Sequence, residues 1–185
     1  ATLVVDGQAT VAVSDAQGRH PLHLAVASAH EGVVRACLQH DNSTDMVDEA
    51  NRSPLHYAAR LGERRAMPRQ EELIRALLDA GAPVDARTIS APPRTGVTPL
   101  MHAANCGYTS PRVLRLLLKY GSDVDAVDAE GRTAEDHARA ALNYPIDPHQ
   151  DGLRRGPGVV EGTLALFRDY RAAGGTWKRY VAEPR

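Results

Sequence analysis

The chain has 185 residues, of which 22 are basic and 23 acidic, so its formal net charge at pH 7 is −1. This balance gives no general attraction to nucleic acid or to anionic lipid. Aromatic residues make up only 4% of the chain, which excludes a large aromatic core and a base-stacking platform. The sequence has no run of about 18 apolar residues, so it predicts no membrane-spanning helix.

One short phrase recurs and predicts where helices begin. It reads HPLHLA at residues 20–25, SPLHYAA at 53–59 and TPLMHAA at 98–104, with a weaker copy, TAEDHA, at 133–138. In the third copy Thr98 is a good N-cap, and Pro99 suits the first helical position because no N–H is needed there. Leu100 and the alanines that follow give a small apolar face at helical spacing.

The spacing of the phrase defines a repeat. Pro21 and Pro54 are 33 residues apart, Pro54 and Pro99 are 45 apart, and Pro99 and Ala134 are 35 apart. A unit of 33 residues with two helices, a hairpin and a T-P-L-H-x-A phrase resembles the ankyrin repeat. The resemblance extends from about residue 15 to residue 128. It implies an all-α ankyrin-repeat solenoid of helix-turn-helix units with β-hairpin fingers, in about four repeats with a polar C-terminal cap.

The first two repeats are expected at residues 15–47 and 48–92. The second is longer than the family spacing in two places, by seven residues within 63–69 and by five within 87–94. Loops of unusual length are often functional or disordered, so both are candidate contacts. The first has three arginines, which suit an acidic partner, although the following QEE would neutralise them locally. The second is stiffened by two prolines and would lose less entropy on binding.

The last two repeats are expected at residues 93–127 and 128–142, the latter being the start of the cap. Met101 stands where the earlier copies have histidine, so the third repeat is expected to rely on packing there. Glu135 and Asp136 replace the leucine and histidine of the phrase, which indicates an end repeat with a polar face. An inserted loop at 143–158 and a capping helix with a tail at 159–185 complete the chain.

Two interpretations of residues 1–14 remain open. They resemble the end of a preceding partial repeat, because their apolar and turn residues are spaced like those of residues 117–128. A small Asp-Gly hairpin that caps the stack is the alternative. The sequence begins with Ala1 instead of methionine, which suggests a processed chain or part of a longer one.

The eight histidines and two cysteines do not form the pattern of a catalytic or metal site. Cys37 and Cys106 are not at metal-ligand spacing, and no H-E-x-x-H occurs. Cys106 lies one turn from His102, but its place before a turn glycine predicts an ordinary, partly exposed thiol. The resemblance implies that His23 and His56 tie neighbouring helix starts together. We therefore predict no enzyme activity, no cofactor and no metal, with two reduced thiols in an intracellular compartment, cytoplasmic or otherwise reducing.

The resemblance also implies where a partner would bind. In ankyrin stacks the hairpin tips and the exposed positions of the first helices form a concave surface. Apolar residues and arginines at such positions favour an interface, although a solvated surface is the alternative for any one position. Carried over to this sequence, the predicted partner-binding residues are Arg19, Val47, Glu49, Arg52, Arg60, Leu61, Arg87, Ile89, Arg94, Val97, Asn105, Val127, Glu130 and Arg132.

The function expected from this resemblance is protein–protein interaction through a preformed concave surface, without catalysis. A second hypothesis is a structural subunit or assembly factor in a large multi-protein complex, with the insertions and the C-terminal tail as contacts. A third is a regulatory ankyrin domain of a longer polypeptide. Charge reversal at Arg52 and Arg60 is expected to abolish binding under the first hypothesis. No nucleic acid and no membrane insertion are expected.

Overall fold

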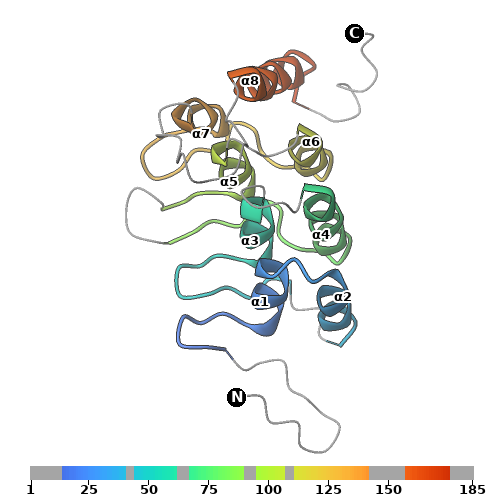
Figure 1. Ribbon diagram of the computed structural model, residues 1–185. Helices are drawn as coiled ribbons and strands as arrows, with labels where there is room; N and C mark the ends of the chain where they lie inside the picture. Colours follow the sequence, from blue (N-terminus) through green and yellow to red (C-terminus); the bar gives the residue numbers. More distant parts are fainter. Residues whose placement is uncertain are drawn as a thin grey trace, which may run out of the picture.

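The structure, a computed structural model, describes residues 14–40, 44–61, 67–89, 95–106, 111–141 and 157–175. In Figure 1 the first helices of the repeats form one column, the second helices α2, α4 and α6 form another, and the hairpin segments project to one side. This arrangement confirms the predicted all-α stack of about four repeats. The helices are α1 (Pro21–Ala27), α2 (Glu31–His40), α3 (Pro54–Arg60), α4 (Met67–Asp79), α5 (Pro99–Asn105), α6 (Pro111–Lys119), α7 (Ala134–Ala140) and α8 (Pro157–Ala172).

The recurring phrase starts a helix in every repeat, as predicted. Thr98 lies just before α5 in an extended conformation, and its hydroxyl accepts the N–H of Met101 at 3.3 Å. In α3 the N–H of Ser53 donates to Nδ1 of His56 at 3.0 Å. These bonds satisfy amides that the first turn of a helix leaves without an intrahelical partner. Hydrogen bonds within the first turn therefore determine where these helices begin, and the residues that form them can be recognised in the sequence.

The hydrophobic core is continuous along the stack. Helices α1, α3, α5 and α7 pack in order against one another, while α2, α4, α6 and α8 form the second row. Small residues such as Ala58 and Ala103 are fully buried on the first helices and allow close packing. The largest fully buried apolar side chains are Leu55, Leu73, Ile74, Leu77, Leu100, Met101, Leu114, Leu117, Leu118 and Phe167. Each repeat thus covers the apolar face of the next.

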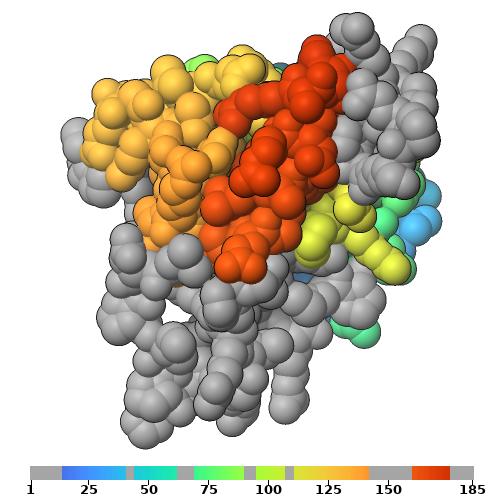
Figure 2. All heavy atoms as spheres, turned by 90° about the horizontal axis from the view of Figure 1, so that it is seen from above, coloured from blue at the N-terminus to red at the C-terminus, as the bar shows by residue number. Residues whose placement is uncertain are grey.

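Helix α8 closes the C-terminal end of the stack. Figure 2, which looks onto this end, shows α8 lying across it between the fourth repeat and α6. Its Phe167 is fully buried, and its Arg171 reaches back to Asp125 at 2.7 Å and to Glu135. The helix begins at Pro157, two residues before its predicted start. Gly174 and the residue after it have positive φ, which ends the helix as predicted.

Several predicted features lie outside the described residues. These are the N-terminal segment up to residue 13, the tip of the second insertion at 90–94, the loop at 142–156 and the tail from 176. The first insertion is described only from residue 67, where it forms the start of α4. The predictions for those segments therefore stay predictions.

Cys106 corrects one expectation about the thiols. Its side chain is buried, and the thiol donates to the carbonyl of Ala59 at 3.7 Å. The sequence predicted a partly exposed thiol because a turn glycine follows it. The preceding repeat covers this position instead.

Candidate protein-binding surface

Four hairpin fingers precede the first helices: finger 1 (residues 14–19), finger 2 (47–52), finger 3 (87–97, described without 90–94) and finger 4 (127–132). Each finger is closed by a backbone bond between its second residue and its last. In finger 2 the N–H of Asp48 donates to the carbonyl of Arg52 at 3.1 Å. The equivalent bonds are Asp15 to Arg19 at 3.0 Å, Thr88 to Val97 at 3.2 Å and Asp128 to Arg132 at 3.0 Å.

A carboxylate organises the inside of three fingers. Asp48 accepts the N–H groups of Ala50 and Arg52 through Oδ1, at 2.9 and 2.8 Å. Its Oδ2 accepts Nε of Arg52 and the hydroxyl of Tyr57, both at 2.7 Å. Burial alone would raise the pKa of the Asp48 carboxyl, but the hydrogen bonds from Arg52 and Tyr57 outweigh it and lower the pKa. The charged carboxylate is thus the stable form.

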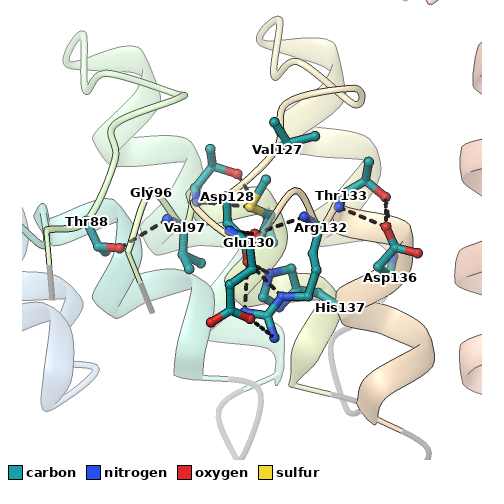
Figure 3. Close-up of polar contacts among 12 residues, drawn as sticks. Thr88, Gly96, Val97, Val127, Asp128, Glu130, Arg132, Thr133, Asp136 and His137 are labelled. Atoms are coloured by element: carbon teal, nitrogen blue, oxygen red, sulfur yellow. Dashed lines mark hydrogen bonds and ion pairs between the residues drawn. The ribbon is translucent and has the colours of Figure 1, made fainter. Parts of the chain in front are cut away.

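Finger 4 repeats this arrangement with a different third partner (Figure 3). Asp128 binds Nε of Arg132 at 2.9 Å, and Nε2 of His137 takes the place of the tyrosine hydroxyl, also at 2.9 Å. Glu130 adds an ion pair to Arg132 at 2.9 Å. Asp136, next to His137 in sequence, turns instead to the hydroxyl of Thr133 at 2.8 Å. Asp136 and His137 therefore bind different partners.

These contacts place three predicted partner-binding residues in the structure of the fingers. Arg19 and Arg132 are ion-paired to the aspartate four residues before them, at 2.6 and 2.9 Å. Arg52 does the same at 2.7 Å and also stacks on the ring of Tyr57 at 5.2 Å. Their cations are therefore neutralised within their own finger. A partner contact by them stays a prediction.

Finger 3 lacks the charged pair. Thr88 replaces the aspartate, and its hydroxyl accepts the N–H of Val97 at 3.1 Å. Both side chains are buried, Val97 being only 3% exposed. The prediction that Val97 faces a partner is wrong, because it fills the inward position that arginine fills in the other fingers. Alignment of Gly96 with Gly18 and Gly131 would have placed Val97 at this position.

Successive fingers are joined by backbone bonds. The N–H of Glu49 donates to the carbonyl of Gln17 at 3.2 Å. Ile89 donates to the carbonyl of Ala50 and Ala129 to that of Thr95, both at 3.0 Å. Fingers 3 and 4 approach each other closely at Gly96, whose φ is +75°. A Cβ added there would come within 3.2 Å of the Ala129 nitrogen. The four fingers therefore form one continuous row.

The row presents one solvent-facing side, here named the outer finger face. Side chains alternate along a finger, so the residues on each side of the inward aspartate or threonine point outward. The large exposed apolar side chains on the described part of the fingers are Val47, Ile89 and Val127, with 37%, 66% and 43% of their area accessible. Figure 3 shows Val127 apart from the polar cluster around Asp128. The outer finger face consists of Ser14, Ala16, Val47, Glu49, Arg87, Ile89, Val127 and Ala129, all exposed.

The structure thus brings together five of the predicted site residues and separates the others. Val47, Glu49, Arg87, Ile89 and Val127 share the outer finger face. Five predicted residues that have not yet been placed lie elsewhere. Arg60 is exposed at the end of α3, Leu61 and Asn105 are half-buried where α3 and α5 end, Glu130 is exposed on finger 4 and pairs with Arg132, and Arg94 lies outside the described residues.

The histidines of the phrase have the structural role that the resemblance implied. Nε2 of His23 lies 2.9 Å from the carbonyl of Arg52, and Nε2 of His56 lies 3.1 Å from that of Val97. Burial, as the largest cause, lowers the pKa of His56 to about 4. Among the described residues no group of three or more His, Cys, Asp or Glu side chains could hold a metal ion. None of their helices is long and apolar enough to cross a membrane.

Comparison with known proteins agrees with this architecture. A family model described as ankyrin repeats (3 copies) matches residues 2–88, and a single ankyrin-repeat model matches residues 95–129. A curated protein of Saccharomyces cerevisiae, the probable 26S proteasome regulatory subunit p28, is 34% identical over 130 residues. That match covers 70% of this chain and 50% of the relative, so the chain spans about half the length of that protein. The repeat geometry and the two family matches together show that the chain belongs to the ankyrin-repeat family, whose members bind proteins.

Proposed function

We propose that the chain is a protein-interaction module and that the outer finger face is its docking surface. The observation that carries this proposal is the row of exposed apolar side chains on fingers whose own charges are neutralised inside. Exposed Val47, Ile89 and Val127 lose water contact favourably when a partner covers them. The backbone bonds between fingers fix the row before binding, which reduces the entropy lost on association.

We further propose that the partner belongs to a large multi-protein assembly. The support is the similarity to the probable 26S proteasome regulatory subunit p28, whose name places it in such an assembly. This favours the hypothesis of a complex subunit or assembly factor over a free adaptor. The 26S proteasome is therefore the first assembly to test, and with a partner of this class we propose that the chain acts inside the cell.

Charge substitution on the outer finger face tests the proposal. Glutamate at both Val47 and Val127 places charges in the apolar row without touching the core, since both side chains are exposed. The matched control is Val33→Glu, because Val33 is 51% exposed on α2, away from the fingers. Arg52 and Val97 are unsuitable, because their substitution would disturb the inside of a finger.

The measurement is binding of the labelled chain to purified yeast 26S proteasome, followed by native gel and interferometry. We expect the wild-type chain and Val33→Glu to bind alike and the double variant to bind at least tenfold more weakly, about 1.4 kcal/mol. Equal binding by the double variant would exclude the outer finger face as the docking surface. No binding by the wild-type chain would exclude this partner and leave the surface to be tested with another.

A further inference from the structure

The described part of finger 3 carries its positive charge at a different position from the other fingers. In fingers 1, 2 and 4 an arginine lies at the last position and is paired inward with its aspartate. In finger 3 both members of that pair are uncharged, Thr88 and Val97, yet they make the same closing bonds. The arginine stands instead at residue 87, one position before the inward residue, and is exposed.

Arg87 is held in place by backbone carbonyls and forms no direct ion pair in the described part of the chain. Its Nη1 donates to the carbonyl of Val127 at 2.6 Å and lies 3.5 Å from that of Gly96. Its own carbonyl accepts the side-chain amide of Asn51 at 2.5 Å. Among the described residues it forms no ion pair with a carboxylate. A guanidinium has five N–H donors, so two carbonyls leave donors for another group.

The surroundings of Arg87 on the outer finger face are mostly apolar. Ile89 is two residues away on the same finger. Val127, whose carbonyl accepts a hydrogen bond from Arg87, is on the next finger. Ile89 and Val127 are 66% and 43% exposed. Glu49 on finger 2 is the acidic side chain of this face, and Asp85, just before finger 3, interacts with the Arg87 charge. A cation among apolar side chains interacts more strongly with a ligand once a partner excludes water.

We propose that Arg87, Ile89 and Val127 form a recognition site for a carboxylate flanked by apolar side chains in an extended segment of a protein partner. The planar guanidinium suits a carboxylate, which it can bind through two parallel hydrogen bonds. Ile89 and Val127 supply the contact area on both sides. This inference rests on the proposed function, because it assigns the partner chemistry of the same face.

A phosphorylated or nucleic-acid ligand fits these observations less well. Phosphate groups carry more charge and are bound by clusters of cations. Among the described residues the outer finger face has a single cation, and Glu49 on the adjacent finger would repel a dianion. With one arginine and a glutamate nearby, this face suits a ligand group with a single negative charge, such as one carboxylate.

A peptide-display selection tests the site with short peptides in place of the whole partner. The probe is a library of random twelve-residue peptides, selected separately on the wild-type chain, on Arg87→Glu and on Arg168→Glu. The last variant is the control, because Arg168 is exposed on α8, away from the fingers. We expect wild-type and control pools enriched in Asp or Glu next to apolar residues, and the Arg87→Glu pool enriched in Lys or Arg there.

A double-mutant cycle then measures the contact itself. Arg87→Met keeps an unbranched side chain and removes the charge. It replaces Arg87→Glu if circular dichroism shows that charge reversal disturbs the fold. Changing the selected carboxylate to its amide is expected to weaken binding to the wild-type chain about tenfold and binding to Arg87→Met less than twofold.

The outcomes separate this inference from the function on which it rests. Peptide pools with the same charge preference for wild-type and Arg87→Glu, or an equal loss in both arms of the cycle, would overturn the carboxylate site and leave the docking surface intact. Failure of the wild-type chain to enrich any peptide would count against both.

Discussion

His56, Met101 and Asp136 occupy equivalent positions in three successive repeats and receive the same N–H with three different atoms. Nδ1 of His56 and Oδ2 of Asp136 accept the N–H of the residue before the helix at 3.0 Å, and the Met101 sulfur accepts it at 3.4 Å. Only the histidine has a second ring nitrogen that can donate to the next repeat, at Val97. A thioether has no proton to donate, so α5 relies on packing there, with Met101 in the core.

The His56 ring makes folding stability depend on pH. Its pKa is about 4 in the fold against 6.5 without burial, so the unfolded chain takes up a proton first as the pH falls. The contribution of His56 to the free energy of unfolding is complete above pH 6.5. It declines between pH 6.5 and 4, by roughly 3 kcal/mol in total. Urea unfolding at pH 7.0 and 5.0 will measure the decline.

The matched variant for this prediction is His56→Met, which copies Met101. The sulfur can still accept the N–H of Ser53, but nothing titrates at this position. We expect lower stability than wild type at pH 7, because the bond to Val97 is lost, and a shallower pH dependence between 6.5 and 5. An unchanged slope in the variant would show that other groups cause the decline.

The elements could be predicted where their chemistry is local, and less well where it depends on the neighbouring repeat. The phrase around Thr98 predicted the helix starts because N-cap and proline preferences act within one turn. The Asp-x-x-x-Arg spacing in three fingers carries a signal for inward ion pairs, whereas the resemblance alone predicts these arginines on the binding surface. The prediction for Val97 is wrong because finger 3 has neither the aspartate nor the arginine of that pair, so this spacing is absent there. The burial of Cys106 depends on the Ala59 carbonyl of the preceding repeat.

The contact between fingers can be measured by comparing two glycines. Gly96 and Gly131 have nearly the same φ, +75° and +76°, but an added Cβ meets the Ala129 nitrogen at 3.2 Å only at Gly96 and open space at Gly131. Alanine at either site pays the cost of positive φ, about 1 kcal/mol. We expect Gly96→Ala to lose roughly 2 kcal/mol or more, because finger 4 must also move.

Denaturant unfolding of the two alanine variants provides the measurement. Both variants share the backbone cost, so the difference between them reports the approach of fingers 3 and 4 alone. Equal losses would mean that the fingers adjust freely and that the row is not rigid before binding. That result would also remove the entropy argument for the outer finger face.

At the scale of the whole molecule, a stack in which each repeat contacts only its neighbours transmits damage over short distances. Phe167 is fully buried where α8 closes the end, and Leu100 is fully buried in α5 at the middle. Either change to alanine removes buried apolar contacts at a cost of about 3 kcal/mol. The two losses of stability are similar in size. The helices whose local stability falls are expected to differ between the two variants.

Hydrogen exchange can resolve that difference. Phe167→Ala is expected to speed amide exchange in α7 and α8 by up to about a hundredfold, while α1 and α3 change by less than about threefold. Leu100→Ala is expected to speed exchange on both sides, because α5 contacts α3 and α7. A uniform increase in every helix for both variants would instead show that the repeats unfold as one cooperative unit. In that case a partner on the outer finger face would stabilise the C-terminal cap as strongly as the fingers it touches.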